Sequence, residues 1–135
     1  MQYGLEHPER VQSVALIGTQ YVMPKRLLKF QNAVFRVMPA GAFQSMGLGK
    51  KDVIQLCGSM TGLDFRQNLK RLECPALVIC GERDRANRRA AKELKERIPH
   101  AALIVIKHAG HEVNVDAPEV LGQTLDAFFR QCAGR

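Results

Sequence analysis

Three short apolar runs, at residues 11–18, 75–81 and 102–107, constrain the fold more than any other feature of this chain. Each run consists mostly of valine, isoleucine, leucine and alanine, without the polar alternation of a strand that has one wet face. Such runs are typical of parallel strands buried on both faces. Helical patterns stand between and around them. The order of elements therefore predicts the α/β class, with a parallel sheet flanked by helices.

Helical patterns follow the second and third of these runs. Alanine and leucine recur at helical spacing over residues 87–98, and Pro99 ends the pattern. A last helix is expected to begin near Pro118, a residue suited to the first helical turn. Its apolar stripe should face the sheet and consists of Val120, Leu121, Leu125, Phe128 and Phe129.

Residues 19–71 separate the first two strands and carry three amphipathic patterns. Two of these patterns span residues 27–38 and 53–60. A third helix is expected to begin at Asp64, with Gln67 completing a capping box. Long insertions between elements often cover a site. The sequence therefore predicts a core made of residues 1–18 and 72–135, and a helical cap made of residues 19–71.

The formal charge of +7 raises the question of a nucleic-acid partner. Basic side chains concentrate at residues 83–97, where small and apolar residues recur on the opposite helical face. That arrangement is typical of an ordinary solvent-exposed helix. The sequence contains no recognition-helix, zinc-finger or aromatic-rich sheet pattern beside it. We therefore expect no nucleic-acid partner.

The apolar runs and the cysteines also bear on location and cofactors. No run reaches eighteen apolar residues and the first residues lack the features of a signal peptide, so we expect a cytoplasmic protein with no membrane partner. Cys74 and Cys80 bracket an extended run that holds their Cα atoms roughly 20 Å apart, too far for a disulfide. No Cys-x-x-Cys pair is present. We expect free thiols, no metal and no cofactor.

Ionisable side chains follow two of the predicted strands directly. Glu82 and Asp84 come after the strand at residues 75–81, and His108 and His111 come after the strand at residues 102–107. In parallel sheets, reactive groups gather just past the carboxyl ends of the strands. An acid and a histidine should therefore meet at one edge of the sheet. A carboxylate there can hold an imidazole in one tautomer and stabilise its charged form.

These segments resemble the α/β-hydrolases. Residues 75–84, Pro-Ala-Leu-Val-Ile-Cys-Gly-Glu-Arg-Asp, resemble the strand and acid turn of that family, and residues 108–112, His-Ala-Gly-His-Glu, resemble its histidine loop. Residues 3–18 and 66–75 are similar to the segments that follow the nucleophile helix and the cap. The resemblance implies a hydrolase of a small ester-like substrate, with Asp84 as the triad acid and His111 as the general base. Glu82 and His108 remain the rival acid and base.

The family nucleophile is absent from this sequence. It sits in Gly-x-Ser-x-Gly on a sharp strand-to-helix turn, and neither Ser13, Ser45 nor Ser59 has glycines at both flanking positions. No cysteine fits the motif either. We therefore expect the chain to begin just after the nucleophile and to be inactive alone.

Two kinds of partner follow from that expectation, besides a small-molecule substrate. One is a missing N-terminal half that carries the nucleophile. The other is a second copy of the chain, joined through the strand at residues 11–18, because that strand lacks its family neighbour on one edge. The alternative to a hydrolase is a non-catalytic relic or interaction subunit with the same fold.

Overall fold

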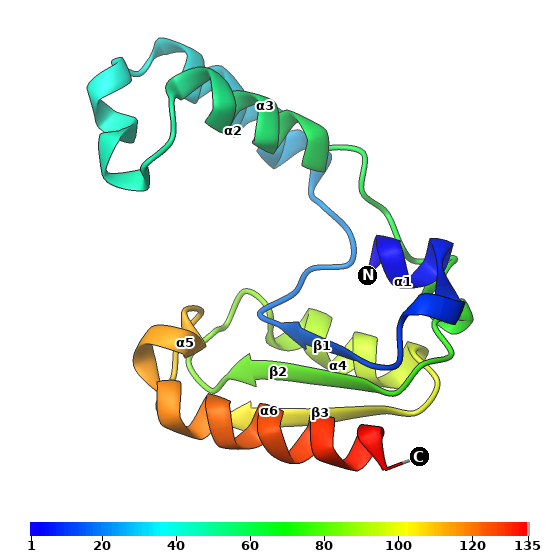
Figure 1. Ribbon diagram of the computed structural model, residues 1–135. Helices are drawn as coiled ribbons and strands as arrows, with labels where there is room; N and C mark the ends of the chain where they lie inside the picture. The colour runs from blue at the N-terminus through cyan, green and yellow to red at the C-terminus, as the bar shows by residue number, and fades with distance from the viewer. Residues whose placement is uncertain (135) are drawn as a thin grey trace. The chain divides into compact units, whose positions relative to one another are not determined.

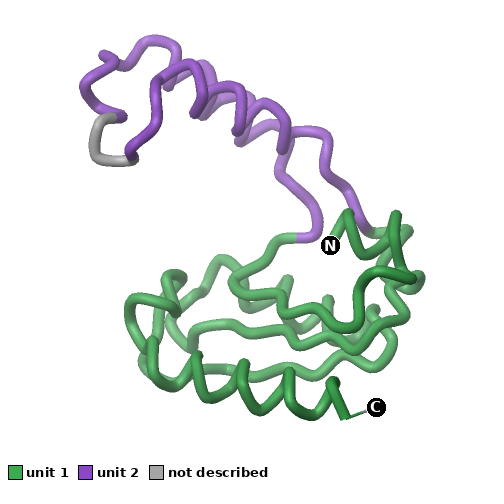
Figure 2. The backbone as a smooth tube through the Cα atoms, viewed as in Figure 1, with its two compact units in different colours: residues 1–20, 66–135 green, residues 21–65 purple. Residues whose placement is uncertain are grey.

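The structure, a computed structural model, describes residues 1–134, without the side chains of residues 44–46. It divides into two compact units (Figure 2). Unit 1 consists of residues 1–20 and 66–135, and unit 2 consists of residues 21–65. Among the described residues, no helix is both long and apolar enough to cross a membrane.

Unit 1 is built on a parallel sheet of three strands in the order β1 (Val14–Ile17), β2 (Ala76–Gly81) and β3 (Ala101–Ile106). The helix α4 (Arg88–Arg97) covers one face of the sheet, and α6 (Pro118–Ala133) covers the other (Figure 1). The predicted α/β class with a parallel, helix-flanked sheet is confirmed.

The three strands differ in burial. All six residues of β2 are buried, whereas Ile17 of β1 is 37% exposed and Val105 of β3 is 47% exposed. The expectation that all three strands are covered on both faces is wrong for the outer two. In the described chain each outer strand has β2 as its one strand neighbour, so its other edge is unpaired, and several of its side chains remain partly exposed.

The first strand is also shorter than the predicted residues 11–18. A 3-10 helix at Pro8–Arg10 precedes it, and the ladder begins where Val14 N donates to Pro75 O at 2.9 Å. Residues 11–13 are therefore a connection and not part of the sheet.

The core of unit 1 lies between β2 and the two covering helices. One face of β2 contributes Leu77 and Ile79, which cluster with Ile106, Ala109, Val113 and Leu121 beneath α6. Successive strand side chains alternate in direction, so Val78 and Cys80 point to the face that α4 covers. Each fully buried aliphatic side chain contributes roughly 1.5–3 kcal/mol relative to an exposed one. The loop after β3 is therefore anchored in the core at Ala109 and at Val113.

Smaller elements complete unit 1. These are α1 (Gln2–Glu6), a 3-10 helix at Leu69–Arg71, and α5 (Val113–Asp116). The helix predicted from Asp64 is absent, which corrects that expectation. Asp64 instead forms an antiparallel bridge with Val22, and Phe65 N donates to Tyr21 O at 2.9 Å. These residues therefore pair with the segment that enters unit 2 instead of forming the first turn of a helix.

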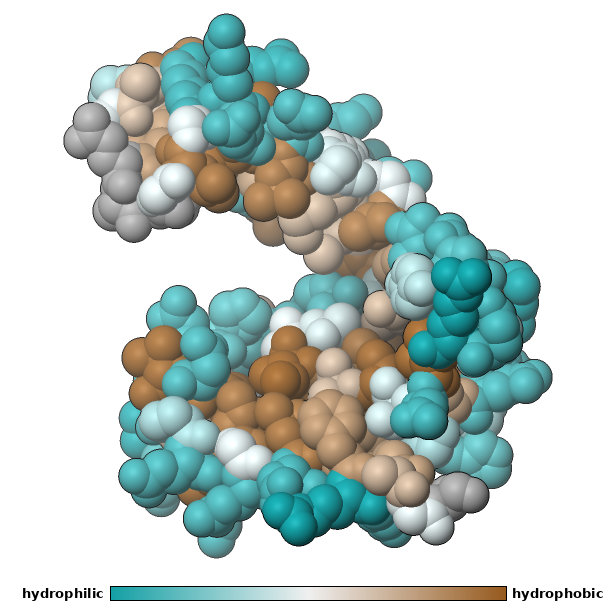
Figure 3. All heavy atoms as spheres, viewed as in Figure 1, coloured by the Kyte–Doolittle hydropathy of each residue, from teal (hydrophilic) through white to brown (hydrophobic). Residues whose placement is uncertain are grey.

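Unit 2 is a pair of helices, α2 (Lys25–Val37) and α3 (Lys50–Met60), joined through a 3-10 helix at Ala40–Met46. Lys50 Nζ donates to Arg36 O and Met38 O, both at 2.7 Å, and so satisfies carbonyl groups at the end of α2. Much of the apolar surface of the pair remains exposed, as Figure 3 shows. The most exposed large apolar residues of α2 are Leu27, Phe30 and Val37.

Candidate active site

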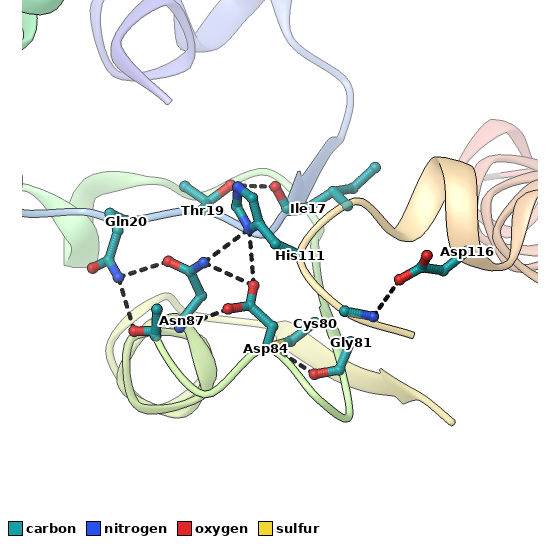
Figure 4. Close-up of polar contacts among 11 residues, drawn as sticks. Ile17, Thr19, Gln20, Cys80, Gly81, Asp84, Asn87, His111 and Asp116 are labelled. Atoms are coloured by element: carbon teal, nitrogen blue, oxygen red, sulfur yellow. Dashed lines mark hydrogen bonds and ion pairs between the residues drawn. The ribbon is translucent and has the colours of Figure 1, made fainter. Parts of the chain in front are cut away.

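The acid turn and the histidine loop meet at the carboxyl edge of the sheet. Since β2 and β3 are parallel neighbours, the segments that follow them leave the sheet on the same side. Asp84 Oδ2 lies 2.9 Å from His111 Nδ1 (Figure 4). The Asp84 side chain is 3% exposed, and the His111 side chain is 64% exposed. The structure thus brings together the two residues that the sequence singled out.

Backbone hydrogen bonds join the two loops. Glu82 N donates to Ile106 O at 2.9 Å, and Arg83 N donates to Ala109 O at 2.8 Å. The close approach requires glycine at the end of β2, because a Cβ on Gly81 would overlap the backbone oxygens of Ala109 and Gly110. The relative position of the acid and the histidine is therefore set by main-chain contacts.

Two further contacts hold the histidine loop. Asp116 Oδ2 accepts a hydrogen bond from Gly110 N at 2.6 Å, which ties the loop to α5. At the end of β1, Gly18 has a φ of 54°, and a Cβ there would lie 3.1 Å from the His111 ring. A side chain at Gly18 would therefore be strained and would press on the imidazole.

The rival acid and the rival base contact each other. Glu82 Oε2 accepts a hydrogen bond from His108 N at 2.9 Å and lies 3.8 Å from His108 Nδ1. Both side chains are exposed, and the hydrogen bond from the His108 amide lowers the pKa of Glu82. His108 has a φ of 60°, so Glu82 stabilises a left-handed turn at the start of the histidine loop. The contact of Glu82 with the His108 turn is thus explained by a structural role, without a role in proton transfer.

Asp84 has a second partner that the sequence did not reveal. Asn87 N donates to Asp84 Oδ1 at 3.1 Å, and Asn87 Nδ2 donates to Asp84 Oδ2 at 2.7 Å. Burial raises the pKa of Asp84, but the hydrogen bonds from Asn87 and His111 outweigh that effect and lower it overall. Asp84 is therefore ionised at neutral pH despite its burial.

The protonation of the histidine follows from that charge. An ionised carboxylate only accepts hydrogen bonds. In a neutral His111 the ring hydrogen is therefore on Nδ1, and this N–H donates a hydrogen bond to Asp84. His111 Nε2 is then the nitrogen that can accept a proton from another group.

Asn87 gives a weak signal in the sequence. It stands at the start of the helical pattern of residues 87–98, a position where asparagine is common. Gln20, which donates to Asn87 Oδ1 at 2.6 Å, gives none, because its partner lies 67 residues away.

Among the described residues, no group of three histidine, cysteine, aspartate or glutamate side chains is placed to hold a metal ion. Cys57, Cys74, Cys80 and Cys132 are free thiols. Burial raises the pKa of Cys80, the cysteine nearest to the acid turn in the sequence, so it remains a thiol at neutral pH.

Comparison with known sequences identifies the family. The sequence pattern of the family described as "Alpha/beta hydrolase family" matches residues 5–124. The chain belongs to this family. An Escherichia coli O81 protein named "Putative carbamate hydrolase RutD" is 30% identical over 78 residues, which are 57% of this chain and 29% of that protein. The chain therefore spans less than a third of the curated relatives that it matches.

Solved structures share the fold. The enol-lactonase from Burkholderia xenovorans LB400 superposes with a TM-score of 0.83 at 19% identity, over 95% of this chain and 60% of the enzyme. A thermophilic esterase from Thermogutta terrifontis superposes with a TM-score of 0.73 at 19% identity, over 96% of this chain and 60% of the esterase. At this identity the likeness concerns the fold alone.

Proposed function

We propose that this chain supplies the acid and the base of a hydrolase that cleaves a small ester-like substrate. Asp84 orients His111, and His111 Nε2 takes a proton from a nucleophile and later returns it to the leaving group. The observation that carries the proposal is the 2.9 Å contact between His111 Nδ1 and a buried, ionised Asp84.

The burial of Asp84 supports this role. Taking a carboxylate out of water is costly unless donors replace the water. Here three donors do so, and one of them is an imidazole whose ring is largely exposed. As a proton arrives at Nε2, the positive charge that develops on the ring lies beside a fixed negative charge. Asp84 stabilises the imidazolium in this way without itself becoming protonated.

The substrate class rests on two features. A sequence relative is named as a carbamate hydrolase, and solved neighbours of the same fold are described as an enol-lactonase and an esterase; all three names refer to acyl-type bonds. Unit 2 occupies the place of a cap in the sequence, between β1 and β2. We propose that it is the cap and that its exposed apolar side chains, such as Phe30, favour apolar acyl or leaving groups.

The nucleophile has to come from outside these 135 residues, because none of the three serines lies in Gly-x-Ser-x-Gly. The experiment is therefore to express the chain together with the reading frame that precedes Met1, and to treat the product with a fluorophosphonate, which labels activated serines. We expect labelling that is lost in His111→Ala and retained in His108→Ala.

The 135-residue chain alone is the control. Loss of a triad nucleophile costs on the order of a million-fold in a serine protease, so the chain alone should not turn over p-nitrophenyl butyrate. Turnover by the chain alone that His111→Ala abolishes would contradict this account of the nucleophile. A preceding frame without the motif, or labelling that ignores His111, would instead favour the non-catalytic subunit.

A further inference from the structure

Asn87 and Gln20 form a network behind the acid that the hydrolase role does not by itself require. Asn87 is 6% exposed and lies immediately before α4. Gln20 follows β1, and its Nε2 donates both to Asn87 Oδ1 at 2.6 Å and to Ala86 O at 3.1 Å. The segments after β2 and β3 thus meet at the Asp84 carboxylate, and the segment after β1 reaches it through Asn87, as Figure 4 shows.

Gln20 determines which way the Asn87 amide points. Because Gln20 donates to Asn87 Oδ1, the Nδ2 group of Asn87 faces Asp84. The opposite orientation would place two donors together at Gln20 and two acceptors together at Asp84. The long-range contact with Gln20 thus fixes a donor toward the acid.

Asn87 and His111 donate to the same oxygen of Asp84. Both Asn87 Nδ2 and His111 Nδ1 reach Oδ2, at 2.7 and 2.9 Å, and they lie 3.0 Å from each other. When Nδ1 carries a proton, neither nitrogen can accept from the other. Their close approach therefore follows from the shared acceptor, and Asn87 contacts the carboxylate through two donors of its own.

We propose that Asn87, oriented by Gln20, is a positioning residue that keeps the Asp84 carboxylate ionised and aimed at His111. A role of Asn87 in catalysis rests on the proposed function. The effect of Asn87 on the Asp84 carboxylate is independent of that function, because it depends only on contacts within unit 1. Without Asn87, the carboxylate would remain buried but would lose its side-chain amide donor, and burial alone favours the neutral acid.

The test is a pH titration of the Asp84 side-chain carboxyl by carbon-13 NMR in the purified 135-residue chain. We expect its pKa to lie below the ordinary aspartate value of about 3.9 and to move upward in Asn87→Ala. In Asn87→Asp it should move further upward, because a second carboxylate repels the first. Other titratable or charged groups around Asp84 in the described chain include His111, the Cys80 thiol with Arg88 beyond it, and the flanking Arg83 and Arg85, and all variants retain them.

Gln20→Ala keeps Asn87 but removes its orienting partner. It should shift the Asp84 pKa upward by less than Asn87→Ala does. Circular dichroism shows whether the Asn87 variants fold, and if they do not, Gln20→Ala alone provides the test. Gln123→Ala, an exposed amide on α6, is the matched control and should leave Asp84 unchanged.

An Asp84 titration that is the same in wild type, Gln20→Ala and any folded Asn87 variant would overturn the proposal. The readout requires no turnover. A chain that fails the fluorophosphonate test can therefore still pass this one, and the two failures are distinguishable.

Discussion

Units 1 and 2 differ in how completely they bury their apolar side chains. In unit 1, β2 lies between α4 and α6, and Ile79 is fully buried. In unit 2, α2 and α3 pack on each other, and Phe30 and Val37 remain 68% and 83% exposed. A pair of helices buries only the stripe that each turns toward the other.

The more completely buried unit is also the one in which fixed geometry is needed. Proton transfer requires side chains held to within a fraction of an ångström, and the candidate site lies entirely within the closely packed unit. In the cap role that we propose for unit 2, apolar contact with a substrate would tolerate looser packing. Changes in unit 1 should therefore alter proton transfer and stability, and changes on the surface of unit 2 should alter neither of these two strongly.

The largest expected effect concerns the acid. In a protein that contains the nucleophile, Asp84→Asn should lower kcat by roughly 10⁴, as loss of the orienting carboxylate does in a related triad. Glu82→Gln should cost far less, because Glu82 stabilises the turn at His108. The measurement is kcat with p-nitrophenyl butyrate. The opposite ranking of the two variants would show that Glu82 is the acid.

The next largest effect concerns the free energy of unfolding, which should respond differently to substitutions in the two units. Ile79→Ala empties a fully buried position and should lower the free energy of unfolding by about 2–5 kcal/mol. Phe30→Ala removes a larger but exposed side chain and should change it by about 0.5 kcal/mol or less. Urea denaturation followed by circular dichroism measures both. A large loss in Phe30→Ala would mean that the surface of α2 is covered in solution.

The free edge of β1 should make the isolated chain associate at micromolar concentration. In the described chain β1 pairs with β2 alone, and no lysine or proline lies in the strand to discourage a further partner. Ile17→Lys should weaken this association by roughly tenfold, which is about 1.4 kcal/mol. Ile104→Lys on β3, a strand followed at once by Lys107, is the matched control. Light scattering that finds a monomer in the wild type would refute the prediction.

The smallest effect is a pH dependence. Folding lowers the pKa of Asp84, so its stabilising contribution is complete above the unfolded aspartate pKa of about 3.9 and is lost as the pH falls through the folded value. The free energy of unfolding should thus fall more steeply in acid for wild type than for Asp84→Asn. Urea titrations at a series of pH values test this. Parallel curves would show that Asp84 gains nothing from its partners.

The sequence predicted the sheet and the acid–histidine pair because both depend on local patterns. Runs such as residues 75–81 reveal a buried strand, and acids and histidines stand just after two such runs. The resemblance to the α/β-hydrolases then singled out Asp84 and His111 among them. It could not predict the contact of Gln20 with Asn87, which depends on the sheet bringing distant turns together. The helix expected at Asp64 was wrong for the same reason, since the bridge to Val22 is a non-local contact that overrides a capping pattern.

The most direct test of the central claim is the tautomer of His111, read from the nitrogen-15 shifts of its ring in mildly alkaline solution, where imidazole is neutral. If Asp84 orients His111, the wild-type chain and Glu82→Gln should both show the proton held on Nδ1, and Asp84→Asn should lose that preference. A wild-type ring with its proton on Nε2, or a tautomer that changes in Glu82→Gln and not in Asp84→Asn, would contradict the assignment.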